Sequence, residues 1–445
     1  MSVFHGRVAH FTRCPFTESK NEQERQAFEI LDDIVVKVEG NVIAAVVPAK
    51  SPQGKQLVQD QGLTQYRLTE TQILIPGFID THLHAPQYSY TGTATDLPLM
   101  QWLSEYTFPA ESRLAKDPYE EAKGLFNRVV DRTLKCGTTT GVYFATKDLE
   151  VTKVLADVCK EKQQRAFIGK VCMDRHSPEF YVETTQDALD DTETLIQYVK
   201  QLDSIVYPII TPRFIPTCST ELLKGLADIA DKYDCHIQSH ISESIDEVQF
   251  TASLHPLDGS DTNIFQRAGL LRPKAIYAHA VHLSEDDVRI LAKHRAAISH
   301  CPLSNFYFAQ GYFPVAKFMR MGLQVGLGTD VAGGYSPSMF NAQRMAVVAS
   351  LAGSFQSANQ LDHMITYKDA FYLATLGGAL ALGLGNQLGT INPGFKFDAV
   401  VLDAAQGDNI DLFPRDTPED IFQKLCTLGD DRNVKMVFVN GKKVI

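Results

Sequence analysis

A segment near residue 80 ends in two histidines, His82 and His84, after an apolar run that starts at Ile75. Side chains two residues apart on a β-strand point to the same face, so these two imidazoles can bind one metal ion. Two histidines on a solvated strand need not bind anything, and the pair alone leaves both interpretations open. A metal site therefore requires further ligands from elsewhere in the chain.

Three later strand-like segments also end in side chains that bind metals. His240 ends the run 235–240, His279 ends the run 275–279, and Asp330 ends the run 324–330. A histidine or aspartate that is buried at a strand end without a partner is energetically costly. Convergence of these side chains on one cation removes that cost. The four strand ends together predict a metal centre.

The composition indicates a large globular protein. With 445 residues, 44% of them hydrophobic, the chain can bury the core of one large α/β domain and a smaller one. Its net charge of −11 opposes binding to a polyanion, so we expect no nucleic-acid partner. The first residues lack the pattern of a secretory signal, and no apolar run is long enough to cross a bilayer. We therefore expect no membrane association and a cytoplasmic location.

Strand-like segments alternate with amphipathic helical segments through the middle of the chain, as in a parallel α/β fold. One helix signal begins at Asp117-Pro118, where an N-cap precedes a proline at the first helical position; others begin near Leu222 and at Ser284. Residues 76–385 are predicted to form a (β/α)8 TIM-like barrel, whose active site lies at the carboxyl ends of its strands. The eight predicted strands end near His84, Phe144, Met173, Arg213, His240, His279, His300 and Asp330.

Both ends of the chain differ from this middle part. Strand-like segments lie at 34–43, 397–402 and 434–443, and the last contains Asn440-Gly441, a hairpin turn signal. Neither end alone has enough strands to fold independently. Residues 1–75 and 386–445 are therefore predicted to combine into one small β-sandwich-like domain beside the barrel.

The segment 76–84, followed by His240, His279 and the strand end 328–330, resembles the metal-dependent amidohydrolase superfamily. The resemblance spans nearly the whole chain. Segments 388–391 and 397–400 are similar to those through which the chain leaves the barrel and re-enters the β domain in that superfamily. Further segments resemble the guanine deaminases within it: 84–88, 96–99 with Trp102-Leu103, 106–111, 211–214, 238–243 and 328–334. This resemblance implies zinc-dependent hydrolysis of guanine at C2 to xanthine and ammonia in purine catabolism, by a homodimer.

The metal centre is expected to hold a single ion. Superfamily members with two metals carry a bridging lysine at the end of the fourth strand, where this chain has the segment 211–214. Lys170 lies inside the third strand and is interpreted as a structural lysine. Three imidazoles and one carboxylate suit one Zn²⁺ ion per subunit, although iron(II) accepts similar ligands. The predicted ligands are His82, His84, His240 and Asp330.

Three side chains are predicted to act in catalysis. Glu243 lies shortly after His240 and is expected to carry a proton from water to N3 of guanine. Asp330 is expected to accept the second proton, and His279 to orient the water and stabilise the tetrahedral intermediate. The alternative for Glu243 is an acidic N-cap of the following helix.

Guanine presents two acceptors, O6 and N7, and the resemblance implies that Arg213 and Gln87 donate to them. Phe214 and Trp102 are expected to pack on the purine face. A surface ion pair for Arg213 and a core position for Trp102 are the alternatives. The other residues predicted to contact substrate are His84, Leu103, His240, Glu243 and Asp330.

Two other functions remain open at this point. A related amidohydrolase acting on another purine or on a triazine ring would share the metal and the proton shuttle. A non-catalytic scaffold on the same barrel is the alternative from a different class, although every expected ligand is present.

Overall fold

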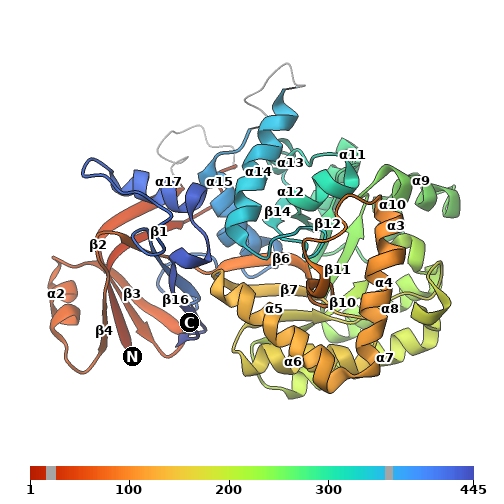
Figure 1. Cartoon of the computed structure of the whole chain (residues 1–445), viewed down its shortest axis with the longest axis horizontal. Coiled ribbons are helices and arrows are strands. Elements are labelled where there is room, and N and C mark those ends of the chain that lie inside the picture. The colour runs from red at the N-terminus through yellow and green to blue at the C-terminus, as the bar shows by residue number, and fades with distance from the viewer. Residues whose placement is uncertain (17–26, 356–363) are drawn as a thin grey trace.

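Two β-sheets form the framework of the protein (Figure 1). The structure, a computed structural model, describes residues 1–16, 27–355 and 364–445. A nine-stranded sheet forms the barrel on the right of Figure 1, and an eight-stranded sheet beside it holds both termini. The predicted fold, a barrel with a small β domain built from both ends of the chain, is confirmed. The exact boundaries at residues 76 and 386 stay predictions.

The barrel strands pair in parallel from β6 to β14. Parallel strands that are covered on both faces have nearly continuous apolar sequences, which is why they are recognisable in the chain. The strands are β6 (Phe78–His84), β7 (Thr138–Phe144), β8 (Arg165–Gly169), β9 (Val171–Cys172), β10 (Val206–Pro212), β11 (His236–Ile241), β12 (Ala275–His279), β13 (Ala297–His300) and β14 (Gln324–Leu327).

Two of these strands differ in detail from the prediction. The third is divided at Lys170 into β8 and β9. The eighth, β14, ends at Leu327, so Asp330 lies in the following loop rather than at the end of the strand. The backbone N–H groups of Thr329 and Asp330 bind β6, where they donate to the Asp80 carboxylate and to the His82 carbonyl.

Hydrogen bonds close the barrel between β14 and β6. The backbone N–H of Asp330 donates to the His82 carbonyl (2.8 Å), and that of His84 donates to the carbonyl of the residue after Asp330 (2.9 Å). The buried Asp80 carboxylate accepts from the backbone N–H (3.0 Å) and the hydroxyl (2.6 Å) of Thr329. These bonds hold the loop that carries Asp330 against the strand that carries both histidines.

Helices connect consecutive strands and cover the outside of the barrel (Figure 1). The N-cap predicted at Asp117 is confirmed, since its side chain accepts from the Glu120 N–H (3.1 Å), and the first turn is a π-helix, η4 (Pro118–Ala122). Ser284 and Asp287 form a reciprocal capping box. The connecting helices are α5 (Lys123–Lys135), α6 (Leu149–Glu161), α7 (Thr185–Gln201), α8 (Thr220–Tyr233), α9 (Ile245–Leu254), α10 (Asp261–Ala268), α11 (Glu285–His294), α13 (Val315–Arg320), α14 (Met339–Ser354), α15 (Tyr367–Tyr372) and α16 (Gly378–Ala381).

The small sheet curls around an aromatic core. Strands three positions apart in a flat sheet lie roughly 14 Å from one another, yet the ring centroids of Phe4 on β1 and Phe438 on β16 are 5.0 Å apart. The predicted Asn440-Gly441 turn joins β16 to β17, and both residues have the positive φ (49° and 80°) that this hairpin requires. The strands are β1 (Ser2–Phe11), β2 (Phe28–Glu39), β3 (Val42–Pro48), β4 (Thr64–Arg67), β5 (Gln72–Pro76), β15 (Ala399–Asp403), β16 (Val434–Val439) and β17 (Lys442–Lys443), with α2 (Pro52–Gln59) after β3 and α17 (Pro418–Leu428) after β15.

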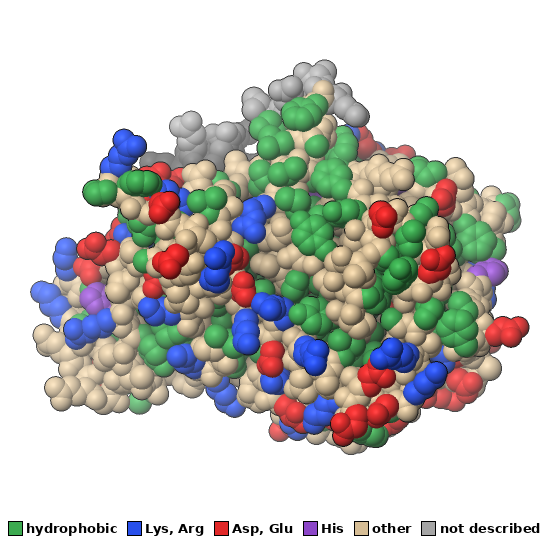
Figure 2. Space-filling model, in the orientation of Figure 1, with side chains coloured by type: hydrophobic (Ala, Val, Ile, Leu, Met, Phe, Trp, Pro, Cys, Tyr) green, Lys and Arg blue, Asp and Glu red, His purple; other side chains and the backbone are tan. Residues whose placement is uncertain are grey.

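Charged side chains of both signs are mixed on the face drawn in Figure 2, where Lys and Arg alternate with Asp and Glu. This pattern differs from the basic stripe that is typical of nucleic-acid-binding surfaces. Among the helices of the described residues, none combines the length and the apolar character needed to cross a membrane.

A buried ion pair joins the barrel to the small sheet. Arg165 on β8 donates from Nε (2.9 Å) and Nη2 (3.1 Å) to the two carboxylate oxygens of Asp398, just before β15. Only 5% and 4% of the two side chains are exposed. The Asp398 carboxylate also accepts from the backbone N–H of Asn440 (2.7 Å). One carboxylate therefore holds together three segments from distant parts of the chain.

Asp398→Asn is expected to lower the free energy of unfolding by about 3 kcal/mol, because it leaves the Arg165 guanidinium buried without a countercharge. Glu161→Gln, which breaks a largely exposed pair with Lys123 (3.0 Å), is expected to cost less than about 1 kcal/mol. Urea unfolding followed by circular dichroism measures both values. Equal costs for the two variants would show that the buried pair contributes no more than a surface pair.

Candidate active site

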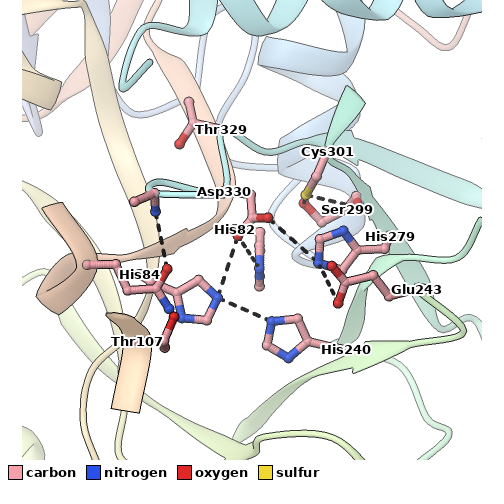
Figure 3. A network of polar contacts seen from close by, with 12 residues as sticks. His82, His84, Thr107, His240, Glu243, His279, Ser299, Cys301, Thr329 and Asp330 are labelled. Carbon is pink, nitrogen blue, oxygen red and sulfur yellow. Dashed lines mark hydrogen bonds and ion pairs between the residues drawn. The ribbon is translucent and has the colours of Figure 1, made fainter. Parts of the chain in front are cut away.

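The predicted site residues gather at the carboxyl end of the barrel (Figure 3). His82 and His84 lie on β6, His240 on β11 and His279 at the end of β12, while Asp330 follows β14. Ligand atoms of His82, His84 and His240 lie within 4.8 Å of one another, and so do those of His82, His279 and Asp330. Four strand ends far apart in the sequence therefore meet in one place.

The distances between these atoms match those of ligands around one tetrahedral cation. Atoms bound tetrahedrally at about 2.0–2.1 Å from a zinc ion lie roughly 3.3 Å from one another. His84 Nε2 lies 3.2 Å from His240 Nε2. Asp330 Oδ1 lies 3.2 Å from His82 Nε2 and 3.5 Å from His84 Nε2. The predicted ligands His82, His84, His240 and Asp330 thus fit around a single ion.

The three histidines present lone pairs rather than charges. Burial lowers the pKa of His82, His84 and His240 well below its ordinary value, and neighbouring imidazoles lower it further. The His240 Nδ1–H donates to the Arg213 carbonyl (2.6 Å), which leaves Nε2 free to bind a cation. His82 Nε2 is buried and has no hydrogen-bond partner among the described residues. A divalent cation would satisfy these nitrogens.

Glu243 and His279 form the side of the site next to Asp330. His279 Nε2 lies 3.7 Å from Glu243 Oε2 and 3.8 Å from Asp330 Oδ2 (Figure 3). Burial and, to a smaller extent, the nearby Asp330 carboxylate raise the pKa of Glu243 to about 8. A carboxyl group that titrates near neutral pH can both take up and release a proton. The N-cap of α9 is Ser244, so the alternative interpretation of Glu243 as that N-cap is wrong.

A pocket of about 460 Å³, including its opening, lies beside these groups. The pocket is lined by His279 and by every residue predicted to contact substrate: His84, Gln87, Trp102, Leu103, Arg213, Phe214, His240, Glu243 and Asp330.

One wall of the pocket comes from the irregular segment between β6 and η4. Trp102 packs against Phe308 (4.8 Å between ring centroids) and Tyr90 (5.6 Å), and it also lines the pocket. The two interpretations of Trp102, core residue and pocket residue, therefore describe the same position. The segment consists of η1 (Ala85–Tyr90), α3 (Leu99–Trp102), η2 (Leu103–Thr107), α4 (Phe108–Arg113) and η3 (Leu114–Lys116), and the first three of these contribute residues that line the pocket.

Arg213 follows β10 and is buried, with 2% of the residue exposed. Its Nη1 and Nη2 donate to the two oxygens of Glu111 on α4 (2.8 and 3.2 Å). The alternative of a surface ion pair is therefore wrong, because the pair is buried at the pocket wall. Gln87 Nε2 donates to the same carboxylate (3.1 Å), and Gln87 Oε1 accepts from the Ala332 N–H (3.3 Å).

Several contributors to the site are missing from the sequence prediction. Ser304 and Phe308 line the pocket, and Asn305 hydrogen-bonds to His279 Nδ1 (2.9 Å). All three follow β13, so the strand-end rule applied to the seventh strand could have found them. Glu111 gives no such signal, because an acidic residue on a helix is usually solvated.

The sequence and the structure both match a known family. Residues 73–444 match the Amidohydrolase family. The chain belongs to the amidohydrolase family. Guanine deaminase of Mus musculus is 42% identical over 455 residues, which cover 100% of this chain and 96% of that protein. Guanine deaminase of Dictyostelium discoideum is 42% identical over 375 residues, or 84% of this chain and 82% of that protein.

A solved structure agrees with these relatives. The crystal structure of guanine deaminase from C. acetobutylicum with bound guanine has a TM-score of 0.89 and 32% identity, and the match covers 100% of both chains. The resemblance to the amidohydrolases, and within them to the guanine deaminases, is confirmed. The family is metal-dependent, and the His/Asp cluster offers a place for the metal.

His82→Ala is expected to retain less than about a tenth of the metal bound by the unmodified protein, because it removes one of four ligands. His236→Ala is the matched control, since His236 lies at the opposite end of β11 from the site and bonds to the Leu382 carbonyl (2.9 Å). Elemental analysis of the purified proteins measures the metal content of both variants. Full occupancy in His82→Ala would remove His82 from the ligand set.

Proposed function

We propose that this protein is a zinc-dependent guanine deaminase that hydrolyses guanine at C2 to xanthine and ammonia in purine catabolism. The observation that carries the proposal is a single pocket that combines a histidine–aspartate cluster able to hold a cation, a carboxyl group whose pKa is raised to about 8, and the buried Arg213 and Gln87. Guanine deaminases at 42% identity over most or all of the chain support the choice of substrate. The neutral histidines and the ligand spacing support the choice of a metal hydrolase.

His82, His84, His240 and Asp330 are the proposed ligands of one zinc ion per subunit. When bound, such an ion lowers the pKa of a water molecule to about 7 and thereby supplies hydroxide near neutral pH. Nitrogen and oxygen donors also suit iron(II), so the proposal of zinc needs a direct test.

Glu243 is the proposed proton shuttle. It takes the proton released by the attacking water and delivers it to N3 of guanine, which prepares C2 for addition. Hydroxide adds to C2, and Asp330 accepts the second proton from the hydroxyl group that this addition forms. The proton then passes to the amino group, so that C2=O forms as the C2–N bond breaks and ammonia leaves. His279 faces both carboxyl groups, and from this position it orients the water and stabilises the tetrahedral intermediate.

The proposed contacts to the purine come from the pocket wall. Arg213 and Gln87 donate to the acceptors O6 and N7, and Phe214 and Trp102 pack on the ring faces. Leu103, His84 and His240 also line the pocket and are proposed to contact the purine. We also propose a cytoplasmic homodimer with no nucleic-acid or membrane partner, on the basis of the family resemblance and the net charge of −11.

The unmodified protein is expected to convert guanine to xanthine in an ultraviolet assay, and Glu243→Gln is expected to lower kcat about 10³-fold because the amide cannot carry a proton. Glu161→Gln on α6 is the control and is expected to keep full activity. Turnover of adenine, cytosine or a triazine without turnover of guanine would show that the proposed substrate is wrong. A stable, metal-free protein with no activity on any of these would favour the scaffold function.

Removal of the metal is expected to abolish activity and to leave the fold intact, because the barrel is closed by its own hydrogen bonds. Dialysis against a chelator, then titration with Zn²⁺ or with Fe²⁺ under anaerobic conditions, measures which ion restores turnover and at what stoichiometry. Restoration by one equivalent of Zn²⁺ supports the proposal. Restoration by iron(II) alone would contradict it.

A further inference from the structure

A carboxylate behind the pocket wall holds two of the side chains that are proposed to contact guanine. Glu111 is completely buried and is not one of the residues that line the pocket, whereas Arg213 and Gln87 both line it. Glu111 Oε1 accepts from Arg213 Nη2 (3.2 Å) and Gln87 Nε2 (3.1 Å). Glu111 Oε2 accepts from Arg213 Nη1 (2.8 Å) and from the Tyr181 hydroxyl (2.7 Å).

These four hydrogen bonds define what Glu111 can do. A carboxylate has about four acceptor positions, and here each oxygen already accepts two donors. Glu111 therefore has no acceptor position left for a substrate atom or a mobile proton. Any effect on the reaction has to pass through the side chains that Glu111 binds, and of these Arg213 and Gln87 line the pocket.

The same bonds fix the orientation of both neighbours. A bidentate pair holds the planar Arg213 guanidinium in one orientation, with the Phe108 ring 5.0 Å from its Cζ atom. Gln87 is held at both ends of its amide, because Oε1 accepts from the Ala332 N–H while Nε2 donates to Glu111. Each side chain keeps further N–H groups beyond those that bind Glu111. These groups belong to residues of the pocket wall.

We propose that Glu111 is a positioning residue that determines recognition of the O6–N7 edge of the purine, by holding the donors of Arg213 and Gln87 in one fixed array. The inference rests on the proposed function, since it assigns guanine to this pocket. Pre-organised donors reject a ligand that lacks the matching acceptor, because their N–H groups are then left unpaired. The alternative is that Glu111 only attaches α4 to the end of β10.

The two roles differ in their effect on two ligands. Guanine carries O6, whereas 2-aminopurine has the same ring and amino group without it. Glu111→Gln is expected to lower kcat/KM for guanine about 100-fold, mainly through KM, because the lost contacts bind substrate and transition state alike. 2-Aminopurine lacks O6 but keeps N7, so its inhibition constant against guanine turnover is expected to rise less than KM for guanine, by under about 10-fold. KM for guanine and the inhibition constant of 2-aminopurine do not depend on the fraction of folded protein, so their ratio separates the two roles.

Two further variants complete the experiment. Glu111→Asp keeps the charge, but the shorter side chain cannot reach both neighbours. It is expected to lower kcat/KM for guanine about 10-fold, again with a smaller effect on the inhibition constant of 2-aminopurine. Asp398→Asn is the matched control, since the Arg165–Asp398 pair is equally buried and bidentate (2.9 and 3.1 Å) but lies outside the pocket. It is expected to lower stability and to change both ligand constants less than about 3-fold.

Equal losses for guanine and 2-aminopurine in Glu111→Gln, or unchanged guanine kinetics, would overturn the inference and leave Glu111 with a purely structural role. Failure of the unmodified protein to deaminate guanine would instead overturn the proposed function. The two failures are therefore distinguished by the unmodified protein alone. Selective loss of guanine recognition supports the inference.

Discussion

Two backbone hydrogen bonds close the barrel between its last and first strands, and the geometry of the site depends on them. They join the backbone of the Asp330 loop to that of His82 and His84. The Asp80 carboxylate strengthens the same junction through its two bonds to Thr329. The same hydrogen bonds therefore close the barrel and set the spacing of the proposed ligands His82, His84 and Asp330. If the sheet stayed open at this point, the Asp330 carboxylate would not be held next to the imidazoles of His82 and His84.

Closure also sets the electrostatics of the site. Imidazoles and carboxyl groups enclosed by the barrel lose hydration, which favours the neutral histidines and raises the pKa of Asp330 and of Glu243. His279 and Asp330 further adopt positive φ (76° and 49°), a conformation that costs roughly 1–3 kcal/mol and persists only where the surroundings enforce it. The fold thus holds these side chains in an arrangement that neither hydration nor an unconstrained backbone favours.

The sequence predicted the groups at strand ends well, because a buried strand that ends in a polar residue leaves a local signal. His82, His84, His240 and Asp330 carry such signals and meet as expected, although the loop position of Asp330 follows from bonds to β6 that no local pattern encodes. Glu111 is different. Its partner Arg213 lies 102 residues away, and their pairing exists only once α4 packs on the end of β10. Long-range pairs of this kind cannot be read from local sequence patterns.

The groups that the sequence predicted and those that it did not predict lie in different parts of the pocket. Strand ends and the loops directly after them hold the groups proposed to activate water and move protons, whereas the donors proposed for the purine edge depend partly on the irregular segment 85–116. Irregular segments tolerate change more readily than barrel strands. A barrel of this kind can therefore keep its hydrolytic chemistry while its substrate changes, provided that the wall segment and its buried carboxylate change together. In this protein Glu111 connects the two parts, because one carboxylate binds Gln87 of the wall and Arg213 of the barrel.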